Sequence, residues 1–344
     1  MTKLESLGWR NHFVMQLEPD SPLMPARVMA VHRGRVEVIG EDLDLSVELS
    51  GNAAGLGVTV GDWVLIDMDG PRVTKLLERF CLFKRGSPGS AGSLQRIAAN
   101  VDTLFIVTSA NRDFNIARLE RYLAIAREAG AYPVIVITKA DQIESVDNYV
   151  ADALRLAPGL QVEALDARSS DEVRRLEDWC GPGQTVALLG SSGVGKSTLV
   201  NTLTGAAQQT HGVREDDQRG RHTTTGRSMH RLAGGGWLID TPGMRELQLV
   251  DLGDALDDVF ADVTVIAENC RFADCEHEGE PGCAVLVAIN DGRLDGERLR
   301  RFKKLRAEER RNTETLAERR ARDRRTGQLY KSILAGKQRQ KGER

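Results

Sequence analysis

A glycine-rich stretch, GSSGVGKST at residues 190–198, constrains the fold of this chain more than any other feature. Gly190, Gly195, Lys196 and Ser197 have the spacing G-x-x-x-x-G-K-[ST], with a strand-like segment before the loop and a helix-like segment after it. Glycines allow the backbone to curl until its N–H groups point at phosphate oxygens, and the N-terminus of the following helix adds positive potential. The pattern predicts a phosphate-binding loop rather than an incidental glycine-rich turn.

Each position of this loop has an expected task. The Lys196 ammonium is expected to reach the β- and γ-phosphates of a nucleotide, and the Ser197 hydroxyl is expected to bind Mg²⁺. The remaining expected phosphate contacts are Ser191, Ser192, Gly193, Val194 and Thr198. The loop selects no base by itself, because it would serve an ATPase or a kinase equally well.

The surroundings of the loop favour an α/β architecture. Apolar strand-like runs alternate with amphipathic helical segments such as NIARLERYLAIAREAG; the runs are VDTLFIVTSA, YPVIVITKAD, QTVALLG and GGWLIDTPG. Strands that are buried on both faces and separated by helices are typical of a parallel sheet covered by helices.

Two shorter motifs end strands of this expected sheet. In DTPG, the Asp240 carboxylate can hold Mg²⁺ through water and Gly243 can donate its N–H to a γ-phosphate, although the tetrapeptide is also a good turn. In TKAD, the Asp141 carboxylate can accept the two N–H bonds of a guanine edge, which adenine does not offer. The Lys139 stem can pack along the nucleotide, and Thr138 completes the expected base loop. An ordinary loop after a strand is the alternative interpretation.

The motifs TKAD, GSSGVGKST, GRHTTT and DTPG, in that order, resemble the circularly permuted GTPases. More narrowly, the chain is similar to the bacterial ribosome small-subunit-dependent GTPases of the RsgA family, from LGW near its start to CRFADCEHEGEPGCAV near its end. The resemblance implies an N-terminal OB domain, a permuted GTPase domain and a C-terminal zinc-binding domain. Permutation moves the chain ends without changing which strands are neighbours, so a base loop can precede the phosphate loop in an otherwise familiar site.

The resemblance also implies a first switch in GRHTTT, residues 220–225, where one of three threonines meets Mg²⁺ and the γ-phosphate; we favour Thr224. Met244 follows DTPG, where many GTPases place a glutamine that orients water, and a thioether cannot do this. His222 is therefore expected to position the attacking water, with a surface histidine as the alternative.

The base loop departs from the family pattern Asn-Lys-x-Asp, because Thr138 offers one hydroxyl where asparagine has a full amide. We expect guanine preference to be kept through Asp141, while the effect on GTP and GDP affinity is left open. The last base-contacting loop is expected near residues 164–166, in EALDARSS, which matches the family poorly.

Residues 1–83 are expected to form an N-terminal extension and an all-β OB-like barrel. Short alternating segments separated by Gly and Asp turns run from about residue 26 to 77 without helix-length periodicity, and an SH3-like barrel is the second choice. The GTPase domain is expected at 84–250, and a helical zinc-binding domain with a basic tail at 251–344. Four basic side chains of the barrel can contact RNA or belong to a solvated strand face: Arg27, His32, Arg33 and Arg35.

Three cysteines and a histidine cluster near the C-terminus with the spacing C-x₄-C-x-H-x₅-C. Three thiolates and one imidazole are typical of a closed, tetrahedral, structural zinc site, so we expect one Zn²⁺ bound by Cys270, Cys275, His277 and Cys283. The segment EHEGEPGC can bury little apolar surface without a metal. Free cysteines with a surface histidine, and a redox sensor, are less favoured. The two other cysteines are expected to be packing residues.

Charge is distributed unevenly along the chain. From residue 297 onward there are 18 Lys+Arg and 7 Asp+Glu, whereas the preceding 296 residues hold 29 basic and 43 acidic side chains. A basic tail on an acidic body favours a polyanionic partner over a helix covered with internal ion pairs. With the family resemblance, that partner is the small ribosomal subunit and its rRNA.

The absence of a membrane-length apolar run and of a signal segment predicts a cytoplasmic protein with no membrane partner, and we expect a monomer.

The favoured function is a Mg²⁺-dependent GTP hydrolase that acts in late maturation of the small (30S) ribosomal subunit and couples hydrolysis to release. One alternative is an RNA-binding assembly scaffold whose nucleotide switch has negligible turnover. Another is an ATP-dependent enzyme in which TKAD is a coincidence.

Overall fold

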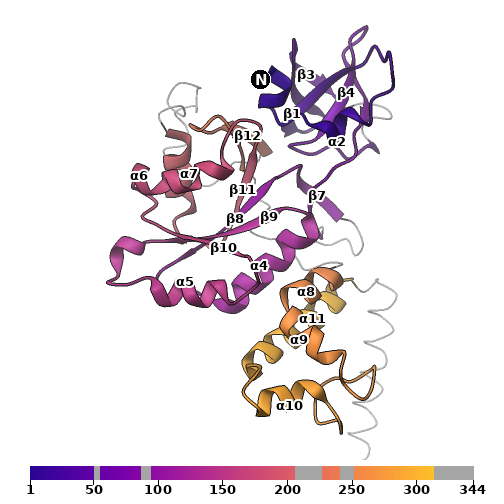
Figure 1. Cartoon of the computed structure of the whole chain (residues 1–344). Helices are drawn as coiled ribbons and strands as arrows, with labels where there is room; N and C mark the ends of the chain where they lie inside the picture. The colour runs from indigo at the N-terminus through magenta and orange to yellow at the C-terminus, as the bar shows by residue number, and fades with distance from the viewer. Residues whose placement is uncertain (50–54, 87–93, 206–226, 241–251, 314–344) are drawn as a thin grey trace, which may run out of the picture.

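A computed structural model of the chain describes residues 1–49, 55–86, 94–205, 227–240 and 252–313. Antiparallel strands occupy one end of the molecule, a mainly parallel sheet with helices on both faces lies in the middle, and the C-terminal helices lie at the other end (Figure 1). His222, Thr224 and Gly243, named above as site residues, lie outside the described residues.

The middle of the molecule is built on five parallel strands in the spatial order β10-β9-β8-β11-β13. All seven residues of β8 are buried, as are six of the seven in β9, which explains their continuous apolar sequences. The five strands are β8 (Thr103–Ser109), β9 (Tyr132–Thr138), β10 (Gln161–Ala164), β11 (Thr185–Leu189) and β13 (Trp237–Asp240).

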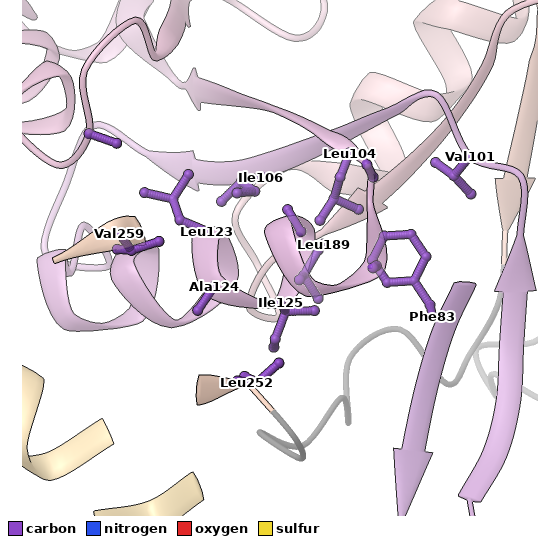
Figure 2. Close-up of a cluster of buried hydrophobic side chains, with 14 of the residues drawn as sticks. Phe83, Val101, Leu104, Ile106, Leu123, Ala124, Ile125, Leu189, Leu252 and Val259 are labelled. Atoms are coloured by element: carbon purple, nitrogen blue, oxygen red, sulfur yellow. The ribbon is translucent and has the colours of Figure 1, made fainter. Parts of the chain in front are cut away.

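Alternation along β8 divides the core between the two faces of the sheet. Leu104 and Ile106 join a cluster with helix α4 (Ile116–Ala129), whereas Phe105 and Val107 join a cluster with helix α7 (Lys196–Thr204). Figure 2 shows the α4 side, where Leu104 and Ile106 lie with side chains from several elements: Phe83, Val101, Leu123, Ala124, Ile125, Leu189, Leu252 and Val259.

Helix α4 has clear local signals at both ends. The Asn115 side chain accepts the N–H of Arg118 at 2.9 Å, which caps the first turn, and Gly130 ends the helix with φ of 81°. A Cβ at Gly130 would also lie 2.8 Å from the Phe80 carbonyl oxygen. The other helical segments of this region are η1 (Ala140–Gln142), α5 (Asp147–Leu154), α6 (Ser170–Val173) and η2 (Arg174–Trp179).

The N-terminal strands belong to the same hydrogen-bonded sheet as the central ones. β12 (Arg227–Arg231) pairs with β13 on one side and with β1 on the other, in the register Ala30↔Ser228. β1 also pairs with β2 and β4, β2 with β3, and β4 with β5, all antiparallel, around a separate apolar cluster. The OB-like barrel stays a prediction. The strands are β1 (Met24–His32), β2 (Arg35–Gly40), β3 (Asp44–Glu48), β4 (Trp63–Asp67) and β5 (Arg72–Leu76).

A short N-terminal segment and a two-stranded ribbon connect these parts. The ribbon consists of β6 (Leu82–Gly86) and β7 (Leu94–Ala99), and the segment holds α1 (Lys3–Ser6) and α2 (Asn11–Val14). The Trp237 indole N–H, at the start of β13, donates to the Ser6 carbonyl at 2.9 Å, and Arg10 pairs with Asp102 at 2.7 Å. The segment thus ties the N-terminal strands to the base of the central sheet.

The C-terminal helices pack on α4. Leu252 and Val259 enter the same cluster as Leu123 and Ile125, as Figure 2 shows. Among the described residues, no helix combines the length and the apolar character that crossing a membrane requires. The helices are α8 (Gly253–Val259), α9 (Ala261–Ala267), α10 (Ala284–Asn290) and α11 (Gly296–Thr313).

Candidate nucleotide site and metal centre

Three of the sequence motifs meet at one edge of the central sheet. β9, β11 and β13 run parallel, with β8 between β9 and β11, and each motif follows or ends one of these strands. The carboxyl ends of parallel strands lie at the same edge, where nucleotides bind in open α/β sheets. The base loop therefore lies beside the phosphate loop although it precedes it by about fifty residues in the chain.

The phosphate loop is curled by its glycines and by Lys196. Gly193 and Gly195 have φ of 80° and 92°, a region that favours glycine, and a Cβ at Gly190 would lie 2.2 Å from the Val107 carbonyl oxygen. Lys196 Nζ donates to the carbonyl oxygen of Gly190 at 2.8 Å and to that of Ser191. Its ammonium thus lies inside the curl of the loop.

The phosphate loop has both exposed and buried positions. Ser192, Gly193, Ser197 and Thr198 are exposed, whereas Val194 is buried under the loop. Ser197 and Thr198 lie in the first turn of α7, where free backbone N–H groups attract anions. The geometry leaves the hydroxyls and the helix N-terminus open to a phosphate and its metal ion.

The base loop is bonded directly to the phosphate loop. The Thr138 side chain is fully buried, and its Oγ1 lies 2.6 Å from the Val194 carbonyl oxygen and 3.0 Å from that of Thr108. Lys139, with φ of 59°, donates from Nζ to the Gly193 carbonyl oxygen at 2.9 Å. A hydroxyl carries one proton, so Thr138 donates to one of its two acceptors at a time. The threonine therefore still reaches the phosphate loop from the position where the family pattern has asparagine.

Replacing Thr138 by valine, which has nearly the same shape, is expected to weaken nucleotide binding and to destabilise the protein. The Val194 carbonyl would lose its buried donor, at a cost of about 1–3 kcal/mol in unfolding free energy. Urea unfolding and titration with a fluorescent GDP would measure both effects. Thr138→Ser keeps the hydroxyl and is the matched control; equal behaviour of the valine and serine variants would contradict the role of this bond.

A third loop, after β10, lies against the base loop at the place where the sequence predicts the last base-contacting loop, and it contains Arg168, which none of the motifs includes. Leu165 donates its N–H to the Ile137 carbonyl oxygen at 2.9 Å. Arg168 then donates from Nη2 to Asp141 Oδ2 at 2.8 Å and to Asp166 Oδ2 at 3.1 Å. The hydrogen bonds from Arg168 hold the pKa of the Asp166 carboxyl below its usual value. An arginine two residues after an aspartate at the end of a strand was the only available signal, and it is a weak one.

Apart from Ser197, the expected magnesium-binding residues are described only at Asp240. This carboxylate ends β13, is exposed, and lies directly across from Ser228 on β12. The first switch and the rest of DTPG, with His222, Thr224 and Gly243, lie outside the described residues, so their expected roles stay predictions.

The cysteine cluster has the dimensions of a zinc site. Its four ligand atoms lie within 4.8 Å of one another; they belong to Cys270, Cys275, His277 and Cys283. Cys270 Sγ lies 3.9 Å from Cys283 Sγ, and His277 Nδ1 lies 3.3 Å from Cys283 Sγ. A tetrahedron with Zn–S bonds of ~2.3 Å has S–S edges of about 3.8 Å, so the donor set fits one zinc ion.

The backbone around the cluster supports the same interpretation. Leu286 donates its N–H to Cys283 Sγ at 3.4 Å, and His277 has a left-handed φ of 56°. The Glu280 carboxylate accepts the backbone N–H groups of Glu276, Glu278 and Gly279 at 2.9, 2.7 and 3.1 Å. Hydrogen bonds from its own backbone N–H and from these neighbouring N–H groups lower its pKa to about 2. A polar loop with this network presents its ligands without an apolar core of its own.

The other two cysteines are packing residues, as expected. Cys81 and Cys180 are each 2 % exposed, and burial raises the pKa of each thiol to about 12. A thiol in this state is a poor nucleophile and a poor metal ligand.

The structure removes Arg27 from the candidate RNA-contacting side chains. Arg27 is 1 % exposed, donates to the carbonyl oxygens of Leu7 and Asn100, and burial lowers its pKa to about 10. It joins the N-terminal segment to the strands instead. His32 pairs with Glu37 at 2.8 Å, whereas Arg33 and Arg35 are exposed at the β1–β2 turn.

Several basic side chains of α11 face acidic partners within the protein. Arg298 and Arg301 bind Glu120 of α4 at 2.7 and 2.9 Å, and Arg306 binds Asp257 of α8 at 3.0 Å. Lys303 binds Glu278, which lies between the cluster residues His277 and Cys283, at 3.1 Å. For this helix, internal ion pairs account for much of the positive charge that the sequence pattern assigned to a polyanionic partner. The basic sequence after residue 313 lies outside the described residues.

The fold and the site together define a P-loop nucleotide-binding protein in which the base loop precedes the phosphate loop. The family model described as RsgA GTPase matches residues 76–250, a range that contains both loops. The chain belongs to the RsgA GTPase family, and it is therefore a GTP-hydrolysing P-loop enzyme. A model described as ABC transporter also matches residues 174–340, but that range begins after the base loop and shares with the first match the phosphate loop.

Curated relatives extend over most of the chain. The small ribosomal subunit biogenesis GTPase RsgA of Mesorhizobium japonicum is 51% identical over 315 residues, which cover 90% of this chain and 91% of the relative. The small ribosomal subunit biogenesis GTPase RsgA 2 of Vibrio parahaemolyticus is 46% identical over 337 residues, covering 97% and 93%.

Solved structures match the fold. YjeQ from Thermotoga maritima has a TM-score of 0.60 at 23% identity and covers 82% of this chain and 97% of its own. YloQ, described as a circularly permuted GTPase, has a TM-score of 0.59 at 22% identity, covering 85% and 96%. At these identities the comparison establishes the circularly permuted P-loop GTPase fold.

Proposed function

We propose that this GTPase acts in late maturation of the small (30S) ribosomal subunit, binds its rRNA, and couples GTP hydrolysis to its own release. The names of relatives about 50% identical over nine-tenths of the chain support the partner. The observation within the structure that carries the enzymatic part is the direct bonding of the base loop to the phosphate loop through Thr138 and Lys139. One guanine nucleotide then spans both loops.

The roles within the site follow the chemistry of each group. Asp141 accepts the guanine N1 and N2 protons, and Lys196 with the N-terminus of α7 binds the phosphates. Ser197 and Thr224 bind Mg²⁺ directly, and Asp240 binds it through water. His222 positions the attacking water, and Gly243 senses the γ-phosphate.

We also propose a role for each of three domains along the chain. Residues 1–83 supply the OB-like barrel, 84–250 the GTPase domain, and 251–344 the zinc-binding domain with its tail. In the described part of α11, several basic side chains form ion pairs with acidic residues of the protein itself. We therefore assign the main rRNA contact to the sequence after residue 313, which holds 10 basic and 4 acidic side chains. Binding through such a tail should weaken steeply as salt rises. Cys270, Cys275, His277 and Cys283 hold one structural Zn²⁺.

The deciding measurement is the GTP hydrolysis rate with and without purified small ribosomal subunits. We expect slow hydrolysis alone and strong stimulation by the subunit. His222→Ala should lose about 10²-fold or more of the stimulated rate while still binding GTP. His211→Ala, in the same segment, is the matched control and should keep the rate. A rate that small subunits do not raise would favour the scaffold function instead.

A further inference from the structure

Arg168 links two acidic residues of neighbouring loops, Asp141 of the base loop and Asp166 of the loop after β10. A single nitrogen, Nη2, lies 2.8 Å from Asp141 Oδ2 and 3.1 Å from Asp166 Oδ2. The guanidinium makes a second bond to Asp166, from Nε to Oδ1 at 3.1 Å. Arg168 is therefore anchored on Asp166 and reaches across to Asp141.

The anchor is itself held in place by its own loop. The Asp166 carboxylate accepts the Arg168 backbone N–H at 2.9 Å, and the Asp166 N–H donates to Glu172 Oε2 at 2.9 Å. Glu172 lies in α6, whose first turn is capped by Ser169. The position of the guanidinium is thus set by contacts at the end of β10 and the start of α6, on a different loop from Asp141.

Without the arginine, this arrangement would be unfavourable. Two carboxylate oxygens that share one nitrogen at these distances lie less than about 6 Å apart, and like charges at that separation repel. Asp141 is 27 % exposed and belongs to a short 3-10 segment, so its side chain can turn away from a repelling neighbour. Arg168 replaces the repulsion with two ion pairs, and the pair with Asp141 favours the present rotamer of that side chain.

We propose that Arg168 is a positioning residue for base recognition: it holds the Asp141 carboxylate in the orientation that the guanine edge requires. The inference rests on the proposed base-reading role of Asp141. Each carboxylate oxygen has two lone pairs, so Oδ2 can accept from Arg168 and from the guanine 2-amino group together, while Oδ1 accepts from N1. The arginine supports the base contact from the protein side and does not compete for it.

The test compares GDP with IDP, because hypoxanthine has the N1 proton and lacks the 2-amino group. In Arg168→Ala, a misplaced carboxylate weakens two bonds to guanine and one to hypoxanthine. GDP affinity, measured by calorimetry on the full chain, should fall about tenfold, the size of one charge-assisted hydrogen bond. IDP affinity should fall less, so the GDP-over-IDP preference decreases. A variant that only loosened the loop would weaken both nucleotides equally.

Two further variants make the test specific. Arg174→Ala removes another exposed arginine, one that pairs with Asp171 and does not contact the base loop, and it should bind both nucleotides normally. Asp166→Asn added to Arg168→Ala removes the repelling carboxylate, so it should restore a large part of the lost GDP preference. Unchanged or tighter GDP binding by Arg168→Ala would overturn the proposal, as would equal losses for GDP and IDP or a double variant no better than the single one.

The variant Asp141→Asn distinguishes the positioning role of Arg168 from the base-reading role of Asp141, on which it rests. If Asp141 reads the base, this variant should prefer XDP over GDP. A variant that keeps its GDP preference would remove both the proposed role of Asp141 and the role of Arg168. A switch to XDP together with a normal Arg168→Ala would overturn the Arg168 proposal alone.

Discussion

Serine in place of Cys283 is expected to abolish stoichiometric zinc and to unfold the segment between α9 and α10. Cys283 is 3 % exposed, its Sγ contacts two other ligand atoms of the cluster, and it also caps α10. Structural zinc supplies about 10–16 kcal/mol of apparent folding free energy in small zinc-binding peptides, and the polar loop from Cys270 to Cys283 has no core to replace it. Metal analysis of the purified protein and thermal unfolding with and without a strong chelator would measure the loss.

The control for this change is another buried cysteine. Cys180→Ala removes a thiol that packs against the other face of the sheet, far from the four ligands in sequence, and it should leave one zinc per chain. The chelator should lower the unfolding temperature of the wild type and of Cys180→Ala, and it should have little further effect on Cys283→Ser. One zinc per chain in Cys283→Ser would contradict the four-ligand site.

The central sheet and the nucleotide loops were predictable because their signals are local. The sequence of β8 is a continuous apolar run because both faces of the strand are covered. Gly195, Lys196 and Ser197 form a recognisable motif because the curled loop requires those residue types. The spacing of the metal ligands is also confined to fourteen residues. In each case the physical cause and the sequence pattern occupy the same short segment.

Long-range pairing was less accessible from the sequence. Nothing in the residues of β1 or β12 indicates that Ala30 lies across from Ser228, because strand pairing depends on backbone groups that every residue carries. This pairing places β12, which follows the expected first switch directly in the chain, in hydrogen-bond contact with an N-terminal strand. The N-terminal strands therefore meet the nucleotide-binding domain at β12, the strand that follows the expected first switch in the sequence.

The positions and partners of charged residues were the least predictable from the sequence, since the same type of side chain can be buried in one place and exposed to solvent in another. Arg27 is buried and Arg33 is exposed, although both lie in the same alternating stretch of the N-terminal strands. The basic residues of α11 have a periodicity that a solvated helix would share. Their ion-pair partners include Glu120 and Asp257, which are distant in the sequence. The sequence alone does not show that these acids lie close to α11 in the fold.

Replacing Glu120 by alanine is expected to be the most destabilising single change at the contact between α4 and α11. The Glu120 side chain has no exposure, and its carboxylate binds Arg298 Nη1 at 2.7 Å and Arg301 Nε at 2.9 Å. Removing one partner of a buried ion pair costs about 3–5 kcal/mol, because the remaining charge stays desolvated. Urea unfolding should show a loss of that size, and limited proteolysis should show faster cleavage in α11.

Asp262→Ala is the matched control, because it removes a second partner of the same arginine. Asp262 binds Arg298 Nε at 3.1 Å, but its side chain is 47 % exposed, and exposed ion pairs contribute about 0–1 kcal/mol. If burial sets the strength of the contact, Glu120→Ala should lose several times more stability than Asp262→Ala. Similar losses would mean that the Arg298 bonds to the carbonyl oxygens of Leu156 and Val259 hold the helix instead. A large difference would mean that the buried Glu120 carboxylate, and not the half-exposed Asp262, sets the strength of the contact between α4 and α11.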